Sequence, residues 1–387
     1  MEYNLLKIKP TDNTFFGTGN QFNYEINNIL KSMNIAYPST FFGGIFTAIL
    51  SKNKSFRQEF FQKKYYDHEK ILEIRQIYLY NEIENKFYIK APLDLFFDKD
   101  NKNEIKLGKF KKCDDYTCLK YNYYLSSDKS FEKVKDCFIE LEFDLESYVK
   151  NEIFLIELKN ENEIFSKNNK IGISIDKKTK NVEMGKLYKI QQTEFIKDEW
   201  SFVVEYKINK EYLKNKYELK GLDLDSDLDL KIGFLKLGGE NKVCKYENIE
   251  SKEIKNFQKL IEDDQKILKK GFYKIILTSD SYFTKDINQI FENKNIELLS
   301  IVNDKPIYIG GYDMEKRNKK SSNEKGIRKM YKGYSAGSIF LVETKEDNID
   351  LNECIKNYID LNECTKNCKG FNNYIVVECN NIEEETI

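Results

Sequence analysis

The sequence predicts an α+β fold with two similar subdomains. Strand-like segments occur in both halves of the 387 residues, and helical patterns lie between them. A charged helical stretch at 250–270 separates the halves and reads as a linker. A chain of this length can bury a sizeable core or form two domains, so a repeated mixed fold is the simplest interpretation.

The first elements are a strand and an apolar helix. Tyr3–Lys9 has the alternating pattern of a strand. The segment IAYPSTFFGGIFTAIL at 35–50 predicts a helix that begins near Pro38, with Ser39 or Thr40 capping its free N–H groups. Because the helix is apolar on nearly every side, we expect it to be buried against a sheet.

Glycines in that helix need a reason. Gly43 and Gly44 would weaken a helix, so we expect close packing or a ligand near its N-terminus. The remaining expected strands of the first half are Glu73–Tyr80, Lys86–Ala91, 201–208 and 229–242. Those of the second half are 272–279, 306–312, 338–343 and 373–378. The charged region Phe97–Tyr124 is expected to be an insertion or a long loop.

Composition indicates a globular protein without a bulk nucleic-acid charge. Hydrophobic residues make up 40% and charged residues 33%, while the net charge is −1, so any nucleic-acid site must be local. The N-terminus MEYNLLKIKP lacks the apolar core of a signal peptide. The apolar stretch Asn34–Leu50 is shorter than the roughly 20 residues of a spanning helix and contains Pro38. We therefore expect a cytoplasmic protein.

The eight cysteines leave two interpretations open. A structural zinc site would show two tight pairs, and only Cys364 and Cys368 approach that spacing. IDLNECIKN at 349–357 recurs as IDLNECTKN at 359–367, so a duplication copied Cys354 into Cys364. Incidental thiols on an inserted segment are the alternative, and the spacing favours them. No metal or cofactor is expected.

Enzymatic patterns are weak. The single histidine, His68, lies in the charged stretch YYDHEK, where a surface histidine is the alternative to a catalytic one. There is no GxxxxGK[ST] loop, and Gly17-Thr18-Gly19 is a lone GxG. The aspartates of LDLDSDLDL at 222–230 could suggest calcium, but the glycine and glutamate of a calcium loop are missing, which favours a solvated acidic turn. We find no nucleotide hydrolase.

Glycine loops beside cations remain as candidate RNA sites. One loop follows a strand at 236–242, and another, at 333–338, follows a basic arm at Lys316–Lys332. Glycines let a phosphate backbone approach the main chain, although an ordinary turn is the alternative for each loop. The candidate RNA-binding residues are Ser39, Thr40, Gly43, Lys236, Gly238, Gly239, Asn241, Lys242, Arg317, Lys319, Lys320, Arg328, Lys329, Lys332, Gly333, Ser335, Gly337 and Ser338.

Five segments of the chain resemble motifs of one known family. YPSTFFGGIF at 37–46 is similar to the family's early helix start, and KAPLDLF at 90–96 to its Ala-Pro-Leu-Asp-Leu strand end. GISIDKKTKNVEMGKLY at 172–188 resembles its hairpin. LGGENK at 237–242 and YSAGSIFLVE at 334–343 resemble its glycine loops. Together these segments resemble the subunit-three RAMP proteins of the Cmr complex, the type III-B CRISPR RNA-guided effector. An arginine that often follows the first glycine pair is absent, and Ile45–Ala48 stand there.

The resemblance implies two ferredoxin-like (RRM-like, RAMP) domains with a protruding β-hairpin, at 1–250 and 265–387. It implies a non-catalytic role in antiviral defence and binding of the 5′ repeat-derived handle of the crRNA. It also implies contacts with the large polymerase-like subunit and with the first backbone RAMP subunit. Two rivals remain: the equivalent type III-A subunit, and a repeat-cleaving RAMP endoribonuclease.

The hairpin at 170–195 is the candidate thumb that the resemblance implies for the guide–target duplex. Its turn, Asp176–Asn181, is polar, and lysines are seldom buried unpaired, so the tip is expected at the surface. A solvated loop is the alternative. The candidate thumb residues are Ile173, Lys177, Lys178, Lys180 and Met184.

Overall fold

The computed structural model is a sheet-rich mixed α/β protein whose chain forms two compact units. It describes residues 3–18, 29–63, 67–100, 104–113, 121–142, 144–150, 157–176, 178–217, 228–263, 267–283, 286–291, 295–310, 330–351 and 369–383. Unit 1 comprises Met1–Asn85, Glu161–Glu250 and Cys368–Gly370. Unit 2 comprises Lys86–Asn160, Ser251–Asn367 and Phe371–Ile387. These units differ from the expected boundaries of 1–250 and 265–387, because residues 86–160 belong with the C-terminal half.

Unit 1 is built on an antiparallel sheet. Its strand order is β3-β14-β1-β16-β15. The bounds are β1 Asn4–Pro10, β3 Leu72–Asn81, β14 Trp200–Ile208, β15 Ile232–Lys236 and β16 Val243–Ile249. The first strand, β1, pairs with both β14 and β16, and β15 forms the edge. Long-range pairing therefore gathers strands from both ends of the unit.

The apolar helix of unit 1 is α1, Pro38–Lys52, and it contacts β3 and β15. The expected cap is wrong: Tyr37 is the N-cap and makes no side-chain cap hydrogen bond. Proline at the first helical position presets the backbone and has no N–H, so Ser39 and Thr40 lie inside the helix. Gly44 lies against the Lys236 carbonyl oxygen, which confirms the expected close packing at that glycine.

The other helices of unit 1 are short. They are α2 Lys54–Lys63, α3 His68–Ile71, α5 Glu161–Ile164 and α6 Lys210–Lys216. Asn209 caps α6, because its side chain accepts a hydrogen bond from the Tyr212 backbone N–H.

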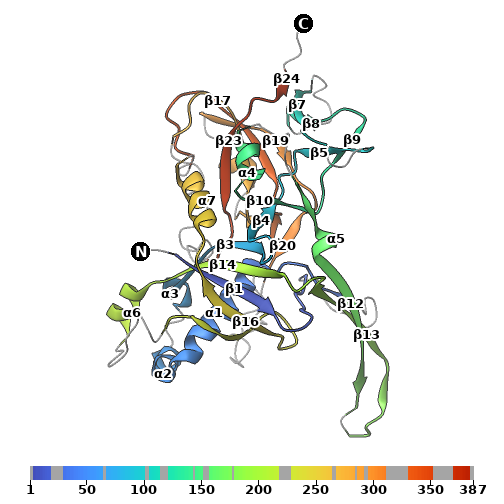
Figure 1. Cartoon of the computed structure of the whole chain (residues 1–387), viewed down its shortest axis with the longest axis vertical. Helices are drawn as coiled ribbons and strands as arrows, with labels where there is room; N and C mark the ends of the chain where they lie inside the picture. Colours follow the sequence, from blue (N-terminus) through green and yellow to red (C-terminus); the bar gives the residue numbers. More distant parts are fainter. Residues whose placement is uncertain are drawn as a thin grey trace. The chain divides into compact units, whose positions relative to one another are not determined.

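The expected hairpin forms and is longer than predicted. Its strands are β12, Phe165–Ile175, and β13, Val182–Phe195, and β13 also pairs with β2, Ile29–Lys31. Figure 1 shows the hairpin extending away from the sheet of unit 1. Its base is held by aromatic rings: Phe165 stacks on Phe195 at 5.0 Å between centroids, and both contact Phe202.

Unit 2 contains a four-stranded antiparallel sheet whose order matches that of β3-β14-β1-β16 in unit 1. The strands are β17 Gly271–Leu277, β19 Ile296–Val302, β22 Ile339–Thr344 and β23 Tyr374–Glu378, arranged β19-β22-β17-β23. In each unit the first strand lies between the third and the fourth, and the second strand pairs with the third. A buried cluster that includes Ile275, Phe340 and Val376 packs on this sheet.

Four groups of shorter strands complete unit 2. They are β11 Lys159–Asn160, β10 Cys137–Glu140 and β4 Lys86–Lys90; β6 Ile105–Leu107, β5 Leu95–Asp98 and β9 Phe131–Lys133; β24 Ile382–Glu383, β7 Lys109–Lys112 and β8 Tyr123–Ser126; and β18 Ser281–Tyr282, β21 Tyr331–Tyr334 and β20 Ile307–Ile309. Its helices are α4 Asp144–Val149, α7 Lys252–Asp263 and α8 Ile287–Ile290. The described part of Phe97–Tyr124 thus contains short strands, and the expected linker contributes α7 to unit 2.

Sequence reasoning missed several strands, among them β16 and β19. The strand expected at 229–242 ends at Lys236, because positive φ angles at Gly238, Glu240 and Asn241 turn the chain back into β16. The alternation of β19 is interrupted by a register shift between Leu298 and Ser300.

In the described residues, no helix has the length and apolarity to cross a membrane.

Candidate nucleic-acid interface

The hairpin presents apolar side chains to solvent. Ile171, Ile173 and Ile175 alternate along β12 and are all exposed. Opposite them, the Tyr188 ring covers Gly172, leaving no room for a side chain there. A two-stranded ribbon has no core for these isoleucines, so the exposed apolar row has no folding role in the described structure.

The hairpin tip is polar and tightly turned. Asp176 accepts hydrogen bonds from the backbone N–H groups of Lys178 and Thr179, and Lys180 has a φ of 58°. Lys178 and Lys180 are exposed, as expected. Of the other candidate thumb residues, Lys177 lies outside the described residues and Met184 lies on β13.

The glycine loop at 236–242 is used by the protein itself. Gly238 has a φ of 75°, and a side chain there would collide with the Phe15 carbonyl oxygen. Gly239 donates its N–H to the same oxygen at 2.8 Å. The glycines therefore permit close approach of segment 14–17. An RNA role for this loop stays a prediction that depends on its exposed side chains.

The polar side chains of this loop have partners within unit 1. Lys236 donates to the Asn241 amide oxygen at 3.3 Å, and Lys242 pairs with Asp12 at 2.8 Å. The Lys242 ammonium holds the pKa of Asp12 below its usual value. Glu240 in the same loop accepts a hydrogen bond from Gln192 of β13 at 2.6 Å. The structure thus brings this loop beside the hairpin in unit 1.

The residues of the loop at 333–338 likewise make packing contacts and hydrogen bonds within unit 2. Gly333 is central in the β18-β21-β20 sheet, where a side chain would meet the Ser281 carbonyl oxygen. Gly337, with a φ of 87°, lies against the Ala91 carbonyl oxygen. Ser338 is buried and donates to Asn303 at 2.8 Å. Ser335 accepts the Ser338 backbone N–H at 3.1 Å.

Most of the basic arm falls outside the described residues. This applies to Arg317, Lys319, Lys320, Arg328 and Lys329. Lys332 is exposed on β21 and is paired in register with Tyr308 of β20. Tyr308 is also exposed. Sequence reasoning missed Tyr308 because a strand pattern does not reveal which residue of a neighbouring strand lies beside it. An aromatic ring beside a cation is a suitable surface for a nucleobase.

The start of α1 gives a mixed result. Ser39 and Thr40 are partly exposed, and Gly43 is exposed with open space around it. Packing therefore explains Gly44 but not Gly43. The helix also leaves Thr47 exposed, so it is less completely apolar at its surface than expected.

His68 lies in an aromatic cluster. Its ring packs against Phe42 and Phe46, each at 5.8 Å between centroids, and its Nε2 is 3.6 Å from Glu69. Lys369 also pairs with Glu69, and hydrogen bonds from His68 and Lys369 hold the pKa of that carboxyl at about 2 despite its partial burial. The expected surface histidine is thus partly buried, and its contacts are those of a packing residue.

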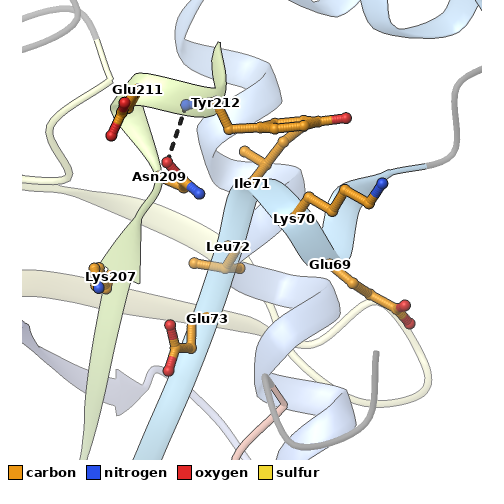
Figure 2. A pocket seen from close by; sticks show the side chains of 9 residues that line it. All are labelled: Glu69, Lys70, Ile71, Leu72, Glu73, Lys207, Asn209, Glu211 and Tyr212. Atoms are coloured by element: carbon orange, nitrogen blue, oxygen red, sulfur yellow. Dashed lines mark hydrogen bonds between the residues drawn. The ribbon is translucent and has the colours of Figure 1, made fainter. Parts of the chain in front are cut away.

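A pocket of about 400 Å³ lies next to this cluster (Figure 2). It is lined by Glu69, Lys70, Ile71, Leu72, Glu73, Lys207, Asn209, Glu211 and Tyr212. Lys70 lies over the Tyr212 ring at 5.8 Å, and Lys207 over the Tyr3 ring at 5.5 Å. Glu73 accepts a hydrogen bond from the Tyr3 hydroxyl. Sequence reasoning selected none of these lining residues, and their charges are largely engaged by neighbouring side chains.

Potential metal ligands gather at one place in the described residues. Carboxylate oxygens of Glu140, Glu142 and Glu253 lie within 4.8 Å of one another. Burial, together with Glu140, raises the pKa of Glu253 to about 8. Four cysteines form no disulfide within the described residues, namely Cys113, Cys137, Cys244 and Cys379. Cys354, Cys364, Cys368 and the acidic stretch 222–227 lie outside the described residues.

Comparison with known proteins identifies the family. The model of the family described as CRISPR-associated protein (Cas_Cmr3) matches residues 6–379. A chain of a type III-B Cmr-beta complex bound to cognate target RNA and AMPPnP is 16% identical, with a TM-score of 0.50, over 97% of this chain and 99% of that one. A chain of the same kind of complex bound to cognate target RNA has the same identity and TM-score over 95% of each chain. No curated protein sequence matches.

At such low identity, the solved structures support the fold, and the family match supports membership. The match spans all five segments on which the sequence resemblance depends. That resemblance is therefore confirmed: the chain belongs to the Cmr3 family of CRISPR-associated proteins, the subunit-three family of the type III-B Cmr complex.

Proposed function

We propose that this protein is the non-catalytic crRNA-binding subunit of a type III-B CRISPR effector complex. In this role it holds the 5′ repeat-derived handle of the guide. It also contacts the large polymerase-like subunit and the first backbone RAMP subunit. Family membership supports the complex, and the exposed hairpin formed by β12 and β13 is the single observation that carries the RNA-binding role.

The hairpin has the chemistry of a wedge. Its base is fixed by the Phe165–Phe195 stack, while Ile171, Ile173 and Ile175 project into solvent along one strand. Apolar side chains inserted between bases can unstack a duplex and bend it. Lysines at the tip can then neutralise backbone phosphates. The hairpin thus fits a thumb that enters the guide–target duplex beside the handle.

The fold supports two ferredoxin-like domains, one in each unit. Such a domain follows a β-α-β-β-α-β pattern. The four principal strands of unit 1 and the four of unit 2 share one antiparallel order, with α1 and α6 after the first and third strands of unit 1. In unit 2, α8 follows the first strand. The residues between β22 and β23 include 352–368, which the structure does not describe.

The absence of catalysis is part of the proposal. General acid–base chemistry on RNA would most simply use a histidine with access to the scissile phosphate. His68 is the only histidine, and its ring packs against Phe42 and Phe46. Substitution of His68 by alanine is accordingly expected to leave RNA binding and complex-dependent target cleavage unchanged. Loss of a repeat-cleaving activity in the purified protein would instead favour the endoribonuclease.

The principal test replaces residues 173–184 with a short Gly-Ser turn in the reconstituted complex. We expect the fold and handle binding to persist, because the Phe165–Phe195 base remains. Target cleavage at the handle-proximal position should shift or disappear. A finer variant, Ile173→Ser with Ile175→Ser, should also shift or reduce target cleavage at that position. Ile83→Ser, at a more exposed isoleucine in a turn of unit 1, should not.

Footprinting of the guide supplies the decisive readout. With the wild-type protein, one guide nucleotide near the handle should be unpaired or displaced. If every guide nucleotide near the handle is equally paired with and without the hairpin, the thumb role is wrong. If the variants also lose the handle footprint, the hairpin acts on handle binding rather than on the duplex.

A further inference from the structure

The outer edge of the unit 1 sheet carries an exposed apolar patch. It consists of Ile232 and Phe234 on β15 and Val243 on β16. Phe234 is 67% exposed, the largest exposed fraction of the three. β15 is the edge strand of this sheet among the described residues. A cluster of this kind on two neighbouring strands is unlike a single scattered surface residue.

Side-chain alternation places this patch on the face opposite α1. Gly233 and Leu235 point the other way, since Leu235 is buried beside Gly44 of α1. Gly233 lies under the Tyr246 hydroxyl and leaves space for it. The inward residues are thus committed to packing, while Phe234 contributes little to burial.

Strand register surrounds Phe234 with cations. Phe234 lies opposite Lys245 of β16, and Lys245 lies opposite Lys9 of β1. Lys236, two residues after Phe234, lies opposite Val243. Lys236 and Lys245 are exposed, and neither forms an ion pair within the described part of the chain.

The acidic residues of this face are already neutralised. Glu247 pairs with Lys7, which holds the pKa of Glu247 below its usual value. Glu82 pairs with Lys7 and Lys9, each at 3.5 Å. The local excess of positive charge therefore lies next to the aromatic ring, and an anionic occupant complements it.

We propose that this platform, the outward face of β15 and β16 centred on Phe234, binds single-stranded RNA by stacking a base on the Phe234 ring. Single-stranded RNA is recognised on sheet surfaces by aromatic side chains for bases and by cations for the backbone. Ile232 and Val243 provide apolar contacts on either side of the ring. The inference rests on the proposed function, because the loop at 236–242, a candidate RNA contact, joins the two strands of the platform.

The test uses photocross-linking in the reconstituted complex. One preparation carries 4-thiouridine in the 5′ handle of the guide, and another carries it in the target segment that flanks the guide-paired region. We expect one of these strands to cross-link to the peptide 232–236. The label that reacts identifies the source of the RNA.

Variants of Phe234 separate stacking from apolar contact. Base stacking on an aromatic ring is lost with leucine but kept with tryptophan. Phe234→Leu should therefore reduce cross-linking about 5- to 150-fold, the range expected for the loss of one stacked base. Phe234→Trp should retain it. Phe61→Ala is the matched control, because Phe61 on α2 is 58% exposed and lies outside the platform.

Three results would overturn the inference. The first is the absence of cross-links from either strand to this peptide, and the second is equal cross-linking by the leucine and tryptophan variants. The third is release of the subunit from the complex by Phe234→Asp with RNA contacts elsewhere unaffected, which would identify a protein-docking surface. If the handle remains protected but no strand cross-links to the peptide 232–236, only this inference is refuted. Loss of all RNA contacts to the chain in the wild-type complex refutes the proposed function as well.

Discussion

Replacing Lys274 by methionine should destabilise unit 2 strongly. Lys274 of β17 pairs with Asp94 at 2.9 Å and donates to the Tyr148 hydroxyl at 3.1 Å. Tyr148 in turn donates to Asp94 at 2.9 Å. The side chains of the charged pair are each 1% exposed, so solvent cannot replace a lost partner.

The expected magnitude follows from this burial. Removing one partner of a buried ion pair leaves an uncompensated charge and costs about 3–5 kcal/mol. The lysine stem would be replaced by a side chain of similar length, so little of the effect should come from lost packing. With Asp94→Asn added, the buried carboxylate is also removed. The double variant should then be less destabilised than the sum of the single variants, with a coupling of about 1–3 kcal/mol.

Hydrogen exchange of the full-length chain in urea is a suitable assay. The two units need not unfold together, so peptides covering β17 and β22 report the local free energy of opening. Lys345→Met is the matched control, because Lys345 forms a half-exposed pair with Glu297 at 2.6 Å on the same unit. Exposed pairs contribute about 0–1 kcal/mol. If Lys274→Met costs no more than Lys345→Met, the reasoning about the buried network is refuted.

Three further predictions test the site and the core. Burial raises the pKa of Glu253 from 4.5 to about 8 in the folded protein, so stability should fall as pH rises between these values, by at most about 1.4 kcal/mol per unit. Glu253→Gln should flatten that slope in urea titrations at several pH values. Gly337→Ala should cost more than about 1 kcal/mol, because its φ is 87°, whereas Gly43→Ala should be neutral or stabilising in thermal unfolding. Charge reversal in the basic arm should weaken handle binding and flatten its salt dependence by about 0.7 for each lost contact. That variant changes three residues to glutamate: Arg328, Lys329 and Lys332. Unchanged affinity and slope in the assembled complex would remove them from the site.

Sequence patterns predicted the elements whose signals are local. The strand β1, the helix α1, the hairpin and the buried strand β22 each have a continuous apolar or alternating pattern. The strands β16 and β19 were missed because positive φ angles and a register shift interrupt the pattern around them. Local periodicity cannot reveal such backbone irregularities.

Features that depend on distant residues could not be predicted from patterns. The motif KAPLDLF contains Asp94, whose partner Lys274 is 180 residues away in sequence. No spacing rule connects two such residues, since sheet topology brings them together. The exposure of Phe234 has the same origin, because the packing of α1 on one face decides which alternate residues of β15 remain in solvent.

The fold alone accounts for three of the glycines that were candidate RNA contacts. Gly238, Gly333 and Gly337 each lie against a carbonyl oxygen of the same unit, so internal packing is enough to require glycine there. Substituting them would alter folding and RNA binding together and could not separate the two. Exposed side chains that contribute little to the fold, such as Lys178 and Phe234, can be changed without that confusion. The RNA hypothesis is therefore best tested on the hairpin tip and the platform rather than on the glycines that first suggested it.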